Sequence, residues 1–170
     1  MDFRTIEGVT EIFRQLNCLG NDNCFFVTYK NTNRDGMKYG LMGATGAIGG
    51  AAVFASGMAN AAANFEALLI NQNELGLGII PLSSARGVQM YVNFSKMTPQ
   101  YDKFFFVPNA SIEEIVVKNY SFLNKKVQKV NIKIAGVPKI YQLAHIHEKD
   151  IPYQEANFTR FMNRYRPVKK

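Results

Sequence analysis

The chain has 170 residues, of which 47% are hydrophobic and 19% charged, and its formal net charge is +7 at pH 7. This length supports one core, or one domain of about 110 residues with an appendage, and leaves too little room for two full domains to fit comfortably. The composition is typical of a folded protein, and the positive charge favours anionic partners without specifying which. Cys18 and Cys24 are too few for a disulfide framework. We therefore expect reduced thiols in a cytoplasmic protein, and a small disulfide closing NCLGNDNC is the alternative.

The first thirty residues predict one helix and one strand. The start MDFRTIEGVTEIF mixes acidic and apolar residues and lacks the basic start and apolar stretch of a secretory signal, so we expect no export. Apolar residues at three-to-four residue spacing predict an amphipathic helix over residues 3–18 that ends near Gly20. CFFVTYK, residues 24–30, is rich in aromatic and β-branched residues and predicts a short strand.

The run GLMGATGAIGGAAVFASGMANAAA, residues 40–63, carries no charge. It holds few strongly inserting side chains, so as a single membrane span it is marginal. Small residues recur every fourth position, a pattern that lets two helices approach closely. We expect a helix packed on the rest of the chain or on a second copy, and the alternatives are a membrane contact and a disordered linker. The predicted contact residues are Gly43, Gly46, Ala47, Gly50, Ala51 and Ala55.

From residue 65 onward, apolar segments and turn signals alternate closely. The predicted strands are FEALLIN, LGLGIIPL, VQMYVNF, KFFFVP, IEEIVVKNY, VQKVNIKI and KIYQLAHI. Such spacing without intervening helices favours an antiparallel sandwich or barrel. In VQKVNIKI, alternation places Val130, Ile132 and Ile134 on a core face and Lys129, Asn131 and Lys133 on a wet face.

The last segment predicts an amphipathic helix of about 13 residues. Pro152 suits its first turn. Its apolar residues repeat at i, i+3, i+4 and i+7, and they are Phe158, Phe161, Met162 and Tyr165.

The order of these elements resembles pleckstrin-homology-like (PH-like) and GRAM-like bacterial proteins. The resemblance rests on VPNASIEEIVVKNYSFLNKKVQKVNIKI followed by AGVPKIYQLAHIHEKDIPYQEANFTRFMNRY. It implies an α+β, mainly β fold: an antiparallel barrel with a C-terminal amphipathic helix over residues 65–166, preceded by the N-terminal segments of residues 1–64. It also implies a binding or scaffolding module and no enzyme. The tip INQNEL carries Glu74 and no Lys or Arg, so we expect no phosphoinositide recognition through that tip.

The search for reactive chemistry yields one weak motif. His145 and His147 alternate in AHIHEKD, so both share a face if the strand continues, and such a pair holds a divalent metal in some proteins. A structural site needs four ligands, so two solvent-facing histidines are the preferred interpretation. No nucleophile or zinc-protease motif is present in the sequence. We expect no catalytic residues, no metal and no cofactor.

KNYSFLNKKVQK, residues 118–129, predicts a basic hairpin with apolar residues at its turn. Cations beside exposed apolar side chains favour an anionic membrane surface. The expected contact residues are Lys118, Phe122, Lys125, Lys126 and Lys129. An ordinary solvated hairpin with Phe122 in the core is the alternative, and no aromatic RNA-binding signature supports nucleic acid. The sequence thus predicts a cytoplasmic, non-catalytic module for a protein partner or homo-oligomer, with peripheral binding to an anionic membrane as the alternative.

Overall fold

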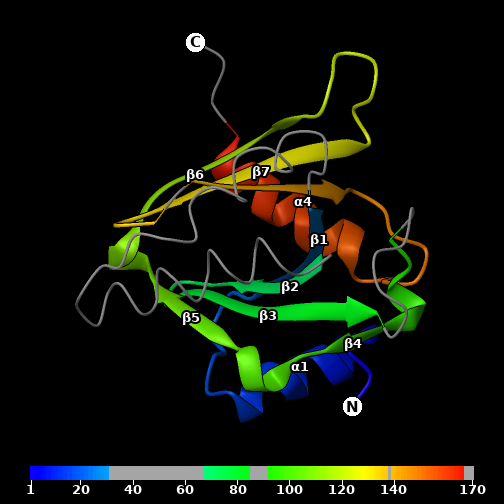
Figure 1. Cartoon of the computed structure of the whole chain (residues 1–170), viewed down its shortest axis with the longest axis vertical. Coiled ribbons are helices and arrows are strands. Elements are labelled where there is room, and N and C mark those ends of the chain that lie inside the picture. The colour runs from blue at the N-terminus through cyan, green and yellow to red at the C-terminus, as the bar shows by residue number, and fades with distance from the viewer. Residues whose placement is uncertain (31–66, 85–91, 138, 167–170) are drawn as a thin grey trace.

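The computed structural model describes residues 1–30, 67–84, 92–137 and 139–166. These residues form one antiparallel sheet with a helix near each end of the chain (Figure 1). The helices are α1 (Ile6–Gln15) and α4 (Gln154–Tyr165). The strands are β1 (Cys24–Lys30), β2 (Ala67–Gln72), β3 (Gly76–Ser84), β4 (Met97–Pro99), β5 (Phe105–Pro108), β6 (Ile112–Asn119), β7 (Val127–Ile134) and β8 (Ile140–His145). The expected α+β, mainly β class is confirmed.

The sheet order is β4-β3-β2-β1-β8-β7-β6, and β5 also pairs with β3. Strands β4 and β6 end this path and do not pair with each other, so the sheet formed by the described residues is open and the expected closed barrel is not confirmed. Strand β1 lies between β2 and β8. Strand β1, which belongs to the predicted N-terminal segment 1–64, therefore lies inside the sheet formed by the predicted barrel segment 65–166. It connects β2, β3, β4 and β5 on one side to β8, β7 and β6 on the other.

Side-chain alternation gives the central strands two buried faces. Along β1, Phe26 belongs to one core cluster, and Phe25 and Val27 belong to the other. Helix α1 covers the second cluster, where Phe13 stacks on Phe25 with ring centroids 5.7 Å apart. Successive strand residues point to opposite faces of the sheet, and a helix lies on each side of it, so the side chains on both faces are buried (Figure 1).

Helix α4 covers the other face of the sheet. Its Phe158 and Phe161 rings lie 5.3 Å and 4.4 Å from the ring of Phe26. The same cluster includes residues from β6, β7 and β8, among them Val117, Val130 and Ile132. The expected amphipathic helix is confirmed over Gln154–Tyr165, and its Phe pair fills the core between the two halves of the sheet.

Three local predictions need correction. The predicted strand VQMYVNF falls partly outside the described residues, and its end forms the 3-10 helix η1 (Phe94–Lys96) because the Asn93 side chain accepts from the Ser95 N–H at 3.0 Å and caps a turn. Helix α1 is shorter than residues 3–18, since Thr5 caps its start. The alternative disulfide is wrong: Cys18 and Cys24 are free, buried and belong to different core clusters.

Candidate functional site

The hairpin of β6 and β7 projects beyond the rest of the described chain at the top right of Figure 1. Its strands stay paired up to Asn119 and Gln128, and the Tyr120 N–H donates to the Val127 carbonyl at 2.9 Å. Residues 121–126 form the tip, and the Ser121 hydroxyl accepts from the Asn124 N–H at 3.0 Å. The hairpin therefore ends in a short, internally bonded turn.

A buried amide fixes the base of this tip. Gln128 is fully buried, and its Nε2 donates to the Lys125 carbonyl at 2.6 Å and to Asn119 Oδ1 at 3.1 Å. From the neighbouring strand, the Ile146 N–H donates to the Lys126 carbonyl at 2.9 Å. Sequence reasoning missed the role of Gln128. Its position on the core face of VQKVNIKI was the available signal, because a buried amide must find hydrogen-bond partners.

Two large apolar side chains at the tip face solvent. Phe122 is 88% exposed and Leu123 is 92% exposed, whereas the other exposed large hydrophobic residues in the described chain range from 41% to 63%. Val117 and Val127 on the two strands are buried. The alternative that turns Phe122 into the core is wrong, because the hairpin carries Phe122 beyond the last core residues. The tip therefore presents an apolar end to its surroundings.

The predicted lysines surround this apolar tip. Among the described residues, none of Lys118, Lys125, Lys126 and Lys129 makes an ion pair. Lys118 lies directly opposite Lys129, a like-charge pair that destabilises a sheet unless an anion is near. The Lys125 and Lys129 ammonium groups lie 6.0 Å and 5.1 Å from the rings of Phe122 and Tyr120.

The opposite end of the same hairpin is electrostatically different. There Lys133 pairs with Glu113 and Lys139 pairs with Glu114, each at 2.6 Å. Charge is therefore separated along the hairpin, with balanced pairs at one end and cations at the tip. The structure brings together all five predicted anionic-surface residues, and it adds Leu123 to them.

The two histidines do not share a site. Strand β8 ends at His145, so the alternation that would place both on one face does not continue. His145 stacks on Tyr29 with centroids 5.2 Å apart, and burial lowers its pKa. His147 is exposed, and its Nδ1 lies 3.3 Å from Glu155 Oε2. Within the described ranges no group of three or more His, Cys, Asp or Glu side chains is arranged to hold a metal ion.

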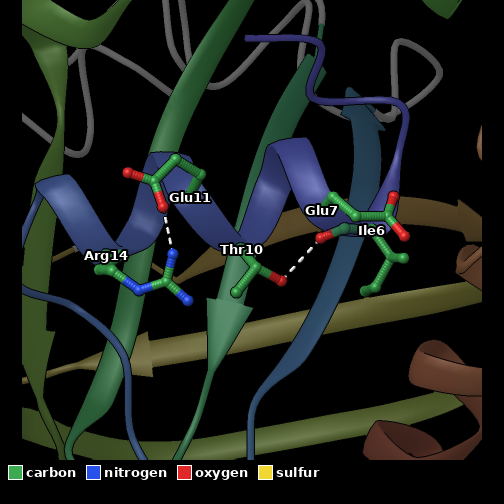
Figure 2. A pocket seen from close by; sticks show the side chains of 5 residues that line it. All are labelled: Ile6, Glu7, Thr10, Glu11 and Arg14. Carbon is green, nitrogen blue, oxygen red and sulfur yellow. Dashed lines mark hydrogen bonds and ion pairs between the residues drawn. The ribbon is translucent and has the colours of Figure 1, made fainter.

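A shallow depression runs along the outer face of α1 (Figure 2). Thr10 Oγ1 donates to the Ile6 carbonyl at 2.6 Å, and Arg14 pairs with Glu11. Thr10, Glu11 and Arg14 thus bond within the helix, and the described lining gathers no reactive set of side chains.

Two further predicted features have these outcomes. The small-residue stripe of residues 43–55 lies outside the described residues. The tip carrying Glu74 is structural, because the carboxylate accepts from the backbone N–H groups of Asn21 at 2.6 Å and Asp22 at 3.3 Å. These bonds, that of Asn21 first, lower the pKa of Glu74. No helix in the described part of the chain has the length and apolarity required to cross a membrane.

No protein-family model, curated protein or solved structure matches this chain.

Proposed function

We propose that this protein is a non-catalytic binding module that docks on an anionic membrane surface through the tip of the β6–β7 hairpin. The observation that carries the proposal is the exposure of Phe122 and Leu123 at 88% and 92% beside cations without acidic partners in the described chain. A membrane is the occupant that matches both features, because its headgroup layer carries negative charge and its interior accepts apolar side chains.

The expected binding free energies favour a contact that needs both the apolar side chains and the lysines. Burying Phe122 and Leu123 in the acyl boundary contributes about 3–6 kcal/mol together. Four lysines near an anionic surface contribute about 4 kcal/mol at low salt. The pinned base of the hairpin reduces the ordering cost, since Gln128 and Ile146 already hold residues 125 and 126 in place. Neither term alone gives stable binding, whereas the two together give binding in the micromolar range or tighter.

The PH-like assignment and the cytoplasmic compartment belong to the same proposal. Antiparallel strands followed by a C-terminal helix, with Phe158 and Phe161 against Phe26, support a PH-like fold. The free thiols of Cys18 and Cys24 support a reducing compartment, and the cytoplasmic leaflet is the one rich in anionic lipid. Self-association through the predicted small-residue stripe stays a prediction.

Vesicle flotation tests the proposed contact. The wild-type chain should float with vesicles of phosphatidylcholine and phosphatidylserine at low salt, and much less with phosphatidylcholine alone. The double variant Phe122→Ser/Leu123→Ser should bind at least about 100-fold more weakly. The double variant Lys125→Gln/Lys126→Gln should bind about 30-fold more weakly. High salt should weaken vesicle binding by the wild-type chain to a similar extent, because it screens the attraction between the lysines and the anionic headgroups.

Matched controls separate the tip from general surface properties. Leu75→Ser removes an exposed leucine at the β2–β3 turn, and Lys96→Gln removes an exposed lysine from η1. Both variants should bind like the wild type. Equal losses in the control and tip variants, or no flotation of the wild-type chain, would refute docking through this hairpin. Binding to a nucleic acid in place of vesicles would assign the lysines to a different partner and would also refute it.

A further inference from the structure

Arg166, the last residue of the described chain, places a cation from the end of α4 at the base of the hairpin. Its Nη2 donates to Gln128 Oε1 at 3.1 Å and to Met162 Sδ at 3.6 Å. The nitrogen of the same Gln128 amide holds the Lys125 carbonyl at 2.6 Å. The nitrogen and oxygen of an amide are less than about 3 Å apart, so the guanidinium lies within about 9 Å of the Lys125 carbonyl. A cation distant in sequence therefore joins the lysines of the tip.

The charge of Arg166 is free for a partner outside the described chain. Arg166 is exposed, and it makes no ion pair with any described residue. Its hydrogen bonds in the described chain use only Nη2, which leaves the Nε and Nη1 donors for another acceptor. Arg164 differs, because its guanidinium pairs with Asp22. Of these two arginines, only Arg166 offers an uncompensated charge.

The cations at the base lie on both faces of the hairpin. Gln128 and Val130 are two residues apart on β7, so both point to the face that α4 covers, and Arg166 lies there with Gln128. Lys129 is between them and points to the opposite face. Lys118 is the register partner of Lys129 on β6 and shares that opposite face. The cations therefore surround the base, and the apolar end of the tip lies beyond them.

The length of the hairpin fits a membrane that meets it end-on. Phe122 lies four residues beyond Lys118, a span of up to about 13 Å. The headgroup layer on one side of a bilayer is about 5–8 Å thick. With the base cations at the headgroup surface, the tip therefore reaches the acyl boundary. A hairpin that lay flat would turn either Lys118 and Lys129 or Arg166 away from the membrane.

We propose that the hairpin enters an anionic membrane end-on, and that Arg166 completes a ring of cations around it by binding lipid phosphate groups. This inference rests on the proposed function, and it adds a contact residue from α4 and an orientation to the same contact. A guanidinium held in one position suits phosphate, because its N–H groups reach two oxygens at once. One cation near the surface changes the affinity about fivefold.

Vesicle flotation of Arg166 variants tests the added residue. Arg166→Gln should bind vesicles of phosphatidylcholine and phosphatidylserine about fivefold more weakly than the wild type. Its affinity should also fall less steeply as salt rises, because one cation fewer is screened. Arg166→Lys keeps the charge and should lose less. The matched control Arg164→Gln removes an arginine that Asp22 already neutralises, and it should bind like the wild type.

A tryptophan placed in the hairpin tests the orientation, because the chain contains no tryptophan of its own. The emission of Phe122→Trp should shift to the blue on binding and be quenched by lipids brominated on their acyl chains. The emission of Tyr120→Trp, at the base, should be quenched mainly by lipids that carry the quencher on the headgroup. Equal quenching of both positions at headgroup depth would show a flat hairpin and refute end-on entry.

The outcomes separate this inference from the function on which it rests. Equal affinity of Arg166→Gln and the wild type would refute the role of Arg166 and leave the proposed docking in place. An Arg166→Gln variant with a lower free energy of unfolding and the wild-type salt dependence would also refute that role, because it would make the residue structural. Absence of flotation of the wild-type chain would refute the proposed function and this inference together.

Discussion

Gln154 provides a sharp test of how the two halves of the sheet are joined. Within the described residues, strands β1 and β8 pair only at Tyr29–Leu143 and Lys30–Gln142. Continuing that register would place Val27 opposite His145, and the Gln154 side chain from α4 occupies this position. Its Oε1 accepts from the Val27 N–H at 2.9 Å, and its Nε2 donates to the Val27 and His145 carbonyls at 3.1 Å and 2.9 Å. One buried amide thus replaces sheet hydrogen bonds where the strands separate.

Gln154→Leu keeps the size of the side chain and removes all three bonds. Each unsatisfied buried group costs about 1–3 kcal/mol, and the carbonyls recover part of this through their second lone pairs. We expect a loss of about 3–5 kcal/mol in the free energy of unfolding, a large share of the 5–15 kcal/mol of a typical domain. The shorter amide in Gln154→Asn should cause an intermediate loss, and it keeps the test measurable if the leucine variant unfolds.

Urea unfolding followed by circular dichroism measures these changes. The control is Gln15→Leu on α1, where an exposed amide contacts Glu11 at 3.1 Å and the change should stay within about 0.5 kcal/mol. A loss below about 1 kcal/mol for Gln154→Leu would show that the amide does not join the two halves of the sheet.

Two further predictions follow from buried titratable groups. The pKa of Glu148 rises from 4.5 to about 7 on folding, so the folded state binds this proton more tightly than the unfolded state. That stabilisation is complete below about pH 4.5 and is lost as the pH rises through about 7. Allowing for partial exposure, Glu148→Gln should be more stable than the wild type by about 1–2 kcal/mol at about pH 8 and equally stable at about pH 4.5. Thermal melts at the two pH values measure this difference. A difference in stability that does not change with pH would contradict the expected loss of stability at high pH. Burial raises the pKa of Cys18 from 9.0 to about 11 and also raises that of Cys24, so a thiol reagent should label Cys18 at least about 100-fold more slowly in the folded chain than in urea, and rapid labelling of the folded chain would contradict its burial.

The proposed contact depends on a hairpin that is held firmly at its base and exposed at its tip. The Gln128 amide and the Ile146 N–H hold the carbonyls of Lys125 and Lys126. Because these bonds lie below the tip, Phe122 and Leu123 have no core position to reach. This arrangement explains how two apolar residues stay exposed in a chain that buries aromatic residues on both faces of its sheet.

The sequence by itself determined the features that repeat over short distances. The predicted strand over residues 24–30 coincides with β1, and the core face of Val130, Ile132 and Ile134 is confirmed. The Phe-bearing helix is confirmed over Gln154–Tyr165. Local periodicity is sufficient here, because the alternation of a strand and the turn of a helix are set by the backbone of neighbouring residues.

Only the tertiary structure decided which distant segments meet. It placed β1 between β2 and β8, inserted Gln154 where β1 and β8 separate, and left Phe122 in solvent. It also stacked Tyr29 on His145, more than a hundred positions away along the chain. The physical reason is that a period specifies which face of an element is apolar, whereas the partner for that face depends on packing and hydrogen bonding across the whole chain.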